Sequence, residues 1–230
     1  MSDRDKELAA RRAVEYVVDG MVVGLGTGST ADFAIRALGE RARSEGLEVR
    51  CVPTSLASAR LGEQVGLDIR SLEDCPAVDL TIDGADEVDP GLDLIKGLGG
   101  ALLREKIVAG ASGRVVIIVD ASKRVGRLGT RSPLPVEVVP FAWTLARKRL
   151  MDLGPQVERR PDPQGQPFVT DNGNFILDCQ FPEGIADPAD TERRIDGIPG
   201  VVGNGFFIGI ADSVVVGDDG RCRVLEREGR

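Results

Sequence analysis

Residues 82–106 read IDGADEVDPGLDLIKGLGGALLREK. The stretch begins like the end of a buried strand, because the aliphatic run VDLTID leads into it, and it finishes like the first turns of a helix. Between those ends lie several carboxylates, several glycines and one lysine, Lys96. A strand, a glycine-rich loop and a helix in this order predict an α/β sheet whose ligands lie beyond the carboxyl ends of the strands.

The same alternation runs through the first half of the chain. Apolar runs predict strands at residues 21–25, 47–52, 78–83 and 114–120. Amphipathic segments predict helices at residues 3–19 and 31–46, after the Pro-Thr-Ser of 53–55, and at 102–111. Strands that alternate with helices favour a Rossmann-like domain with a mainly parallel sheet.

The pattern changes after residue 130. Strands and helices follow in the order β-α-β-β-α-β, with an Asn-Gly reversal at 172–173 and the last strand at 200–210. This order is typical of a smaller, ferredoxin-like α+β domain. We therefore expect a Rossmann-like catalytic domain at residues 1–130 and 208–230, and the ferredoxin-like domain at 131–207.

Composition and charge limit the kinds of partner. The 230 residues carry a net charge of −8 and no Lys/Arg-rich run, which argues against nucleic acid or an anionic membrane as a partner. The N-terminus is charged, and the longest aliphatic run, 115–119, is far shorter than a membrane span. A cytoplasmic protein without a signal peptide is expected. The widely spaced cysteines are expected to be reduced and buried: Cys51, Cys75, Cys179 and Cys222.

The chain contains no histidine. This excludes histidine-based triads, histidine metal sites and imidazole bases. Acid–base chemistry must therefore use Asp, Glu, Lys, Tyr or Cys. Among the remaining features, Phe141 and Trp143 are expected in the core. The arginines of 147–160 are expected on a solvated face, with an oligomer interface as the alternative.

GLGTGST, residues 24–30, joins a predicted strand to a predicted helix. Its glycines let backbone N–H groups converge on an oxyanion, and its hydroxyls add donors. The spacing is neither the dinucleotide fingerprint, because Ser29 replaces the last glycine, nor a Walker loop, because no lysine follows. A single phosphate group is the favoured ligand of this loop. The alternative is a structural role, a glycine turn whose Ser or Thr caps the helix.

Asp83 ends a predicted strand and should face the same edge as GLGTGST. Lys96 opens a second glycine-rich loop, and Glu105 lies near the start of the next helix. A solvated acidic turn or a calcium loop is the alternative, although the EF-hand spacing is absent and Lys96 would compete for the carboxylates. A lysine beside carboxylates suits the stabilisation of an enediolate while a carboxylate moves a proton on carbon.

Seven blocks, in order, resemble the type A ribose-5-phosphate isomerases: GLGTGST, PTS at 53–55, DGADEVD, KGLGGALLREK, VDASK at 119–123, PLPVEV at 133–138 and TDNGN at 170–174. The resemblance implies interconversion of ribose 5-phosphate and ribulose 5-phosphate through a cis-enediolate, in the non-oxidative branch of the pentose phosphate pathway. It also implies no metal, no cofactor, and a two-domain subunit in a homodimer or homotetramer.

The resemblance assigns roles by position. Glu105 matches the general base, Asp83 and Asp86 match the carboxylates that act in ring opening and hydroxyl binding, and Lys96 matches the cation beside the reacting oxygens. The implied substrate-binding residues are Thr27, Gly28, Ser29, Thr30, Asp83, Gly84, Ala85, Asp86, Lys96, Gly97, Leu98, Gly99, Lys123 and Lys6. Lys123 and Lys6 are expected near the phosphate. Many family members carry glycine at the position of Leu98, and we expect the leucine side chain to point away from the loop.

Three other functions remain open from the residues. An amino-sugar-phosphate deaminase would share the architecture, but the missing histidine disfavours it. A sugar-phosphate sensor of a transcription regulator would bind without turnover. A nucleotide-dependent dehydrogenase is disfavoured by the spacing of GLGTGST.

Overall fold

The computed structural model describes residues 3–227. Its largest sheet has seven strands in the order β14-β13-β7-β4-β1-β2-β3. All neighbours are parallel except the β13–β14 hairpin, so the predicted mainly parallel sheet is confirmed. The strands are β1 Val22–Leu25, β2 Arg50–Pro53, β3 Asp68–Ile69, β4 Val78–Gly84, β7 Ser112–Asp120, β13 Ser213–Asp218 and β14 Arg221–Glu226.

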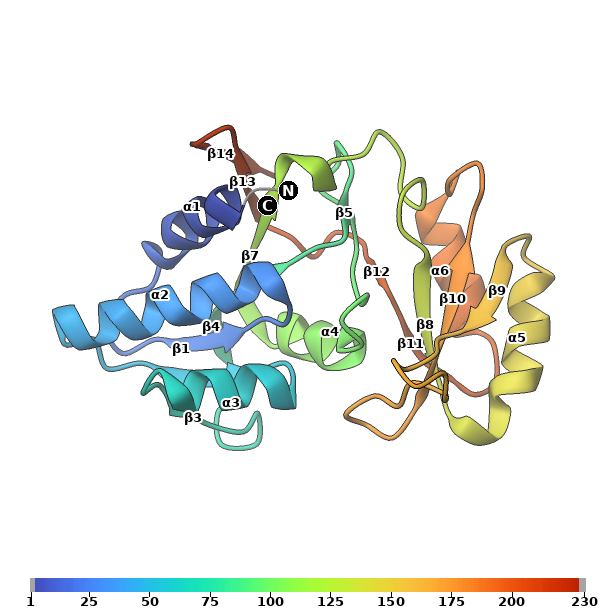
Figure 1. Cartoon of the computed structure of the whole chain (residues 1–230), viewed down its shortest axis with the longest axis horizontal. Helices are drawn as coiled ribbons and strands as arrows, with labels where there is room; N and C mark the ends of the chain where they lie inside the picture. The colour runs from blue at the N-terminus through green and yellow to red at the C-terminus, as the bar shows by residue number, and fades with distance from the viewer. Residues whose placement is uncertain (1–2, 228–230) are drawn as a thin grey trace. The chain divides into compact units, whose positions relative to one another are not determined.

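Helices connect these strands. They are α1 Asp3–Val14, α2 Ser29–Glu45, α3 Leu56–Gln64 and α4 Leu102–Gly110, followed by the short 3-10 helix η1 Ala121–Lys123. Figure 1 shows α1 and α2 beside the sheet, and both helices bury alanine, leucine, isoleucine and valine side chains in one core with β1, β4 and β7. Ser55 caps α3 with a reciprocal capping box, as the hydroxyls of 53–55 predict.

A second sheet has four antiparallel strands in the order β11-β8-β10-β9. When its strands are numbered 1 to 4 along the chain, their order across the sheet is 4-1-3-2, so the ferredoxin-like pattern is confirmed. Its helices α5 and α6 lie beside this sheet (Figure 1). Leu134, Val136 and Leu177 of the sheet form a common core with Leu150 and Ile195 of the two helices. The elements are β8 Leu134–Val138, η2 Pro140–Ala142, α5 Trp143–Met151, β9 Gln156–Arg159, β10 Phe175–Gln180, α6 Pro188–Asp196 and β11 Val201–Asn204.

Three two-residue strands form a small third sheet in the order β12-β6-β5. They are β5 Glu87–Val88, β6 Leu94–Ile95 and β12 Phe206–Phe207. The single strand predicted at 200–210 is therefore wrong, because β11 and β12 belong to different sheets. The chain crosses at Gly205, where a Cβ atom would lie 2.4 Å from the Lys96 carbonyl oxygen.

The chain forms two compact units. The first contains the described residues up to Ala85, Arg104–Arg124 and the described residues from Gly209, and the second contains Asp86–Leu103 and Val125–Ile208. Unlike the division predicted from sequence, this one places 86–103 in the second unit, because β6 of that segment pairs with β12. Residues 1–2 and 228–230 of the predicted first domain lie outside the described residues.

Several local expectations need correction. The helix predicted over 3–19 ends at Val14. Phe141 is fully exposed, because it lies in η2 outside the core that Trp143 contacts. Cys222 is exposed on the edge strand β14, although all four cysteines are free and the other three are buried. Within residues 3–227, no helix combines the length and apolar character needed to cross a membrane.

Candidate active site

Asp83 lies at the carboxyl end of β4 and is 2% exposed. Its Oδ1 atom accepts hydrogen bonds from the backbone amides of Thr27, at 3.1 Å, and Gly84, at 2.7 Å. A Cβ atom at Gly26 would lie 2.2 Å from the same Oδ1 atom and 2.5 Å from the Asp83 Cα atom. Glycine is therefore required at residue 26 so that the GLGTGST loop can approach the carboxylate.

The Thr27 hydroxyl turns toward the 53–55 segment. Its Oγ1 atom lies 2.7 Å from Thr54 Oγ1 and donates to Ser55 Oγ at 2.8 Å. Thr54 Oγ1 donates in turn to the Leu25 carbonyl at 3.0 Å. These buried hydroxyls fix the first half of the loop against the start of α3, which explains why the Pro-Thr-Ser block accompanies GLGTGST.

The second half of the loop opens α2. Gly28 has a φ of 110°, a value that favours glycine, and its exposed neighbour Ser29 begins the helix. Lys6, on α1, is only 9% exposed, and its Nζ atom donates to Ser29 Oγ at 3.1 Å. Thr30 follows as a half-buried residue. An ammonium group, a hydroxyl and a helix N-terminus therefore lie together, which is a favourable environment for a phosphate.

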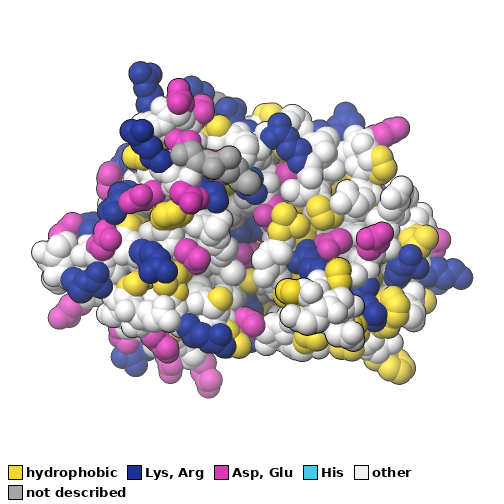
Figure 2. All heavy atoms as spheres, in the orientation of Figure 1, with side chains coloured by type: hydrophobic (Ala, Val, Ile, Leu, Met, Phe, Trp, Pro, Cys, Tyr) yellow, Lys and Arg dark blue, Asp and Glu magenta, His cyan; other side chains and the backbone are white. Residues whose placement is uncertain are grey.

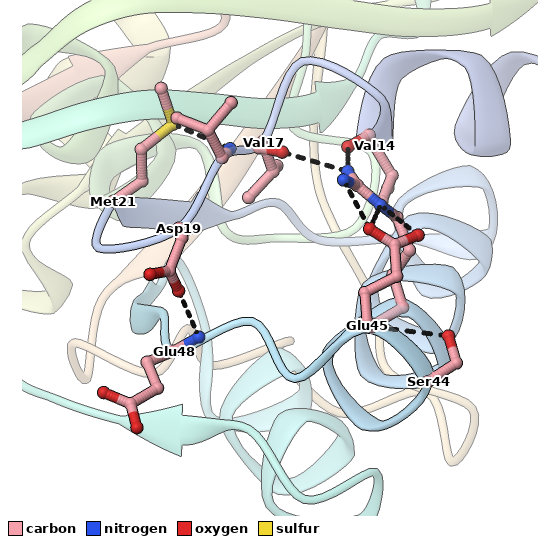
Figure 3. Close-up of polar contacts among 9 residues, drawn as sticks. Val14, Val17, Asp19, Met21, Ser44, Glu45 and Glu48 are labelled. Atoms are coloured by element: carbon pink, nitrogen blue, oxygen red, sulfur yellow. Dashed lines mark hydrogen bonds and ion pairs between the residues drawn. The ribbon is translucent and has the colours of Figure 1, made fainter.

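The far ends of α1 and α2 are tied together by Arg41. Its Nη1 atom donates to the carbonyl oxygens of Val14, at 2.6 Å, and Val17, at 3.0 Å, while Nη2 pairs with Glu45 at 2.9 Å (Figure 3). These bonds satisfy the carbonyl of Val14, the last residue of α1, and that of Val17 just beyond the helix. They also hold the two helices in the register that brings Lys6 to Ser29.

Glu105 lies in the first turns of α4 and is 4% exposed. Three residues later, Val108 packs on β1 so closely that a Cβ atom at Gly24 would lie 2.9 Å from its Cγ1 atom. Residues three apart share a helix face, and α4 runs back from the carboxyl ends of the strands. Glu105 is therefore one turn nearer than Val108 to the edge that carries Asp83.

Lys123 ends η1, directly after β7, and is half-buried. Asp120 caps this turn: its Oδ1 atom accepts from the Ser122 amide at 2.9 Å and from the Ser122 hydroxyl. Because β7 pairs with β4, Lys123 follows a strand end adjacent to that of Asp83. The VDASK block thus places a cation at the same edge of the sheet.

The remaining predicted residues belong to the second unit. Asp86 pairs its amide with the Ile95 carbonyl at 2.8 Å, and its Oδ2 atom accepts from the Leu98 amide at 3.0 Å. Lys96 is 3% exposed, with its Nζ atom 5.4 Å from the centre of the Phe207 ring. The carboxylate of Asp86 therefore holds the loop that follows the buried Lys96.

The loop after Lys96 is compact. Gly97 has a φ of 106°, and a Cβ atom there would lie 2.8 Å from Leu102. Leu98 is not among the residues with positive φ, and its side chain is 41% exposed. Leucine is therefore accommodated without backbone strain, and its exposure agrees with a side chain that points away from the loop.

The structure thus gathers the predicted residues in two groups. The first unit holds Lys6, Thr27, Gly28, Ser29, Thr30, Asp83, Gly84, Ala85, Glu105 and Lys123, and the second holds Asp86, Lys96, Gly97, Leu98 and Gly99. Acidic and basic side chains are interspersed on the face seen in Figure 2. Among the described residues, no group of three or more Cys, Asp or Glu is placed to hold a metal ion.

Two residues of interest were missed from sequence. Glu87 is fully buried and accepts from the backbone amides of Gly129 and Arg131, both at 2.6 Å. Arg160, expected on a solvated face, is instead 12% exposed at its side chain and contacts the loop after Lys96. Sequence periodicity marks neither, since both depend on contacts between distant segments.

Comparisons with known proteins agree with this arrangement. The family model for ribose 5-phosphate isomerase A (phosphoriboisomerase A) matches residues 50–221. A ribose-5-phosphate isomerase A of Gloeobacter violaceus is 58% identical over 221 residues, covering 96% of this chain and 95% of that protein. One of Thermomicrobium roseum is 52% identical over 227 residues, covering 98% and 95%.

A solved structure is also similar. D-ribose-5-phosphate isomerase in complex with phospho-erythronic acid has a TM-score of 0.95 and 42% identity, covering 99% of this chain and all of that one. The chain therefore belongs to the ribose 5-phosphate isomerase A family.

Proposed function

We infer that this protein is an aldose–ketose isomerase that interconverts D-ribose 5-phosphate and D-ribulose 5-phosphate. The observation that carries this inference is the 58% identity to a ribose-5-phosphate isomerase A over nearly the whole of both chains. The residue types of the two groups fit the reaction, because they supply cations for a phosphate and an oxyanion, and buried carboxylates for proton transfer.

The phosphate end of the substrate is assigned to the first unit. Lys6 and Ser29, joined at 3.1 Å, would bind phosphate oxygens with the amides at the start of α2. Gly28 and Thr30 flank Ser29, and Lys123 adds a second cation. Anchoring this end would orient the sugar for the chemical step.

Proton transfer is assigned to Glu105. Its carboxylate would take the proton from C2 of ribose 5-phosphate and return it to C1 through a cis-enediolate. The electron pair of the broken C2–H bond forms the C1–C2 double bond of the enediolate, and the π pair of the carbonyl moves onto O1. The ketose forms when the O2 hydroxyl gives up its proton, O1 gains a proton and C1 takes back the proton held by Glu105. Burial at 4% exposure supports this role, since a carboxylate shielded from water does not have to shed a hydration shell before it takes the proton.

Stabilisation of the developing oxyanion is assigned to Lys96, and the backbone of Gly97, Leu98 and Gly99 would lie beside that oxygen. Asp83 and Asp86 would bind sugar hydroxyls and assist ring opening, with Gly84 and Ala85 completing the backbone between them. The amides of Thr27 and Gly84 that donate to Asp83 Oδ1 hold this carboxylate in a fixed position at the end of β4, which supports its assignment to hydroxyl binding.

Three finer features are proposed with this reaction. It proceeds without a metal or other cofactor, since Lys96 supplies the positive charge. The protein acts in the cytoplasm, which the four free cysteines support, because reduced thiols persist in reducing compartments. It forms a homodimer or homotetramer, and the fully exposed Phe141 supports burial of this surface by another subunit.

The test is turnover of ribose 5-phosphate, followed by NMR detection of ribulose 5-phosphate, with and without EDTA. The proposal predicts turnover that EDTA does not change. Ammonia released from glucosamine 6-phosphate would indicate the deaminase instead. Tight binding of ribose 5-phosphate without turnover would indicate a sensor, and activity lost to EDTA would contradict the metal-free mechanism.

A further inference from the structure

We propose that Arg160, paired with Asp178, is a positioning residue that sets the orientation of the loop carrying Lys96. The inference rests on the proposed function, in which Lys96 stabilises the oxyanion. Arg160 does not touch the substrate in this proposal. It acts through the peptide group that joins Gly97 to Leu98.

The Arg160–Asp178 pair has the geometry of a planar fork. Arg160 Nε lies 2.9 Å from Asp178 Oδ2, and Nη2 lies 2.5 Å from Oδ1. The two side chains are 12% and 22% exposed, so the contact is largely shielded from solvent. A bidentate contact of this kind fixes the plane of the guanidinium as well as its position.

The third nitrogen of the fork holds the loop. Arg160 Nη1 donates to the carbonyl oxygens of Gly97, at 3.0 Å, and Leu98, at 2.9 Å. Two successive carbonyls therefore point at one cation. Gly97, the residue after Lys96, is therefore held by the side chain of Arg160, which lies 63 positions further along the chain.

The same peptide is held from its other side. The Gly97 carbonyl and the Leu98 amide belong to one peptide group, and the Leu98 amide donates to Asp86 Oδ2 at 3.0 Å. The oxygen of this peptide group thus accepts from the Arg160 guanidinium, and its N–H donates to the Asp86 carboxylate. Since Gly97 has a φ of 106° and no side chain, this peptide would otherwise rotate with little steric resistance.

The sheet supplies the rigid support. The Arg160 amide donates to the Ile176 carbonyl at 2.9 Å, which continues the β9–β10 pairing beyond Arg159. Asp178 projects from β10 opposite to Leu177 and Cys179, which face the helices. The guanidinium is therefore mounted on two paired strands.

Lysine cannot replace this arginine. Arg160 makes four hydrogen bonds, two to the carboxylate of Asp178 and two to backbone carbonyls. The planar guanidinium has enough donors at fixed angles for all four, whereas an ammonium group has only three donors and no fixed plane. Arg160→Lys keeps the charge and removes the fork. Asp178→Asn keeps the shape of the side chain and removes the negative charge that orients the Arg160 guanidinium. The two variants therefore alter the Arg160–Asp178 pair at one partner each.

The matched control is Arg159→Lys. Arg159 is the adjacent residue, and its guanidinium lies 4.2 Å from the centre of the Trp143 ring rather than on the loop. We expect Arg160→Lys and Asp178→Asn to lower kcat about 10- to 100-fold, the scale of a misplaced catalytic group, with KM changed much less. Arg159→Lys should stay within about twofold of wild type, because this half-buried arginine packs over Trp143 and Phe175 instead of holding the loop.

A kinetic double-mutant cycle separates positioning from a loss of fold. If Arg160 acts through Lys96, Arg160→Lys should lose most of its effect on kcat in a Lys96→Ala background. Circular dichroism should show all variants folded. Equal kcat for Arg160→Lys, Asp178→Asn and Arg159→Lys, or a full multiplicative effect on Lys96→Ala, would overturn the inference. Absence of turnover in wild type would instead reject the proposed function.

Discussion

The backbone amide of Thr27 donates a hydrogen bond to Asp83 Oδ1 across 3.1 Å. This contact joins two loops that leave neighbouring parallel strands, β1 and β4, at the same edge of the sheet. The position of the GLGTGST loop, which we assign to phosphate binding, therefore depends on the Asp83 carboxylate, which we assign to the sugar hydroxyls. The contact requires the absence of a side chain at Gly26.

Gly26→Ala should separate these loops. The added methyl group would meet Asp83 Oδ1 at 2.2 Å and the Asp83 Cα atom at 2.5 Å, and backbone cannot give way as a flexible side chain can. We expect a loss of stability of about 1–3 kcal/mol, the usual cost of overpacking, and a larger loss of kcat/KM than stability alone explains. Urea unfolding and steady-state assays measure both.

Gly110→Ala is the control for that variant. Gly110 ends α4 with no positive φ, and a Cβ atom there meets nothing within 4 Å. Its activity and stability should remain near those of wild type, because alanine favours the helix. Wild-type activity in Gly26→Ala would show that the Asp83 contact does not matter for function.

Lys6→Ala tests the phosphate end. Removing the ammonium that contacts Ser29 should raise KM for ribose 5-phosphate about tenfold or more, since a hydrogen bond to a charged group contributes about 1.5–3 kcal/mol. Inorganic phosphate should also inhibit the variant more weakly than wild type. Arg4→Ala, an exposed cation on the same helix, is the control. Equal inhibition constants for wild type and Lys6→Ala would remove Lys6 from the site.

Lys96→Ala tests the oxyanion assignment. We expect kcat to fall about 10²- to 10³-fold, as for other lost oxyanion donors, with a smaller change in KM. The kcat and KM values of the purified variant check this. A change confined to KM would mean that Lys96 binds substrate and transition state equally well, which contradicts its proposed role.

The cysteines differ in their expected reactivity. Burial, followed by the charge of Asp68, raises the pKa of Cys51 to about 12, and burial also raises the pKa of Cys179. Burial raises the pKa of Cys222 as well, although Cys222 is the exposed one of the four. Because the thiolate is the nucleophile, the thiolate fraction and the labelling rate should rise with pH.

Mass spectrometry after labelling of the native protein tests this. We expect a thiol reagent to modify Cys222 first, faster at pH 9 than at pH 7, and Cys222→Ser to abolish the early product. In denaturant all four cysteines should react. Labelling of Cys51 or Cys179 ahead of Cys222 in the native protein would disagree with the buried positions of those thiols.

Much of the fold follows from local sequence. The aliphatic runs of β1, β4 and β7 have enough apolar residues to identify buried strands, and Ser55 and Asp187 cap helices as their residue types predict. The two-residue strands β5 and β6 were not predicted, because two residues show no periodicity, and β12 was merged with β11 into one predicted strand. Their pairing depends on how distant segments meet.

The site was predictable to a similar extent. Asp83 and Lys96 stand out because charged residues next to glycine-rich loops have few structural uses. The environment of Lys6 was not predictable from its own helix, since Ser29 is brought to it by the packing of α1 on α2. Arg160 was misplaced for a related reason: its contacts are set by the pairing of β9 with β10, which local sequence does not specify.

The central claim is that Glu105 transfers the proton between C2 and C1. The most direct measurement is turnover of ribose 5-phosphate by Glu105→Gln, with calorimetric binding of phospho-erythronic acid as the check that its site is intact. We predict that kcat falls about 10²- to 10⁴-fold, the usual contribution of a positioned acid–base group, while the acid still binds. A Glu105→Gln variant with near-normal kcat would contradict the account, because another group would then move the proton.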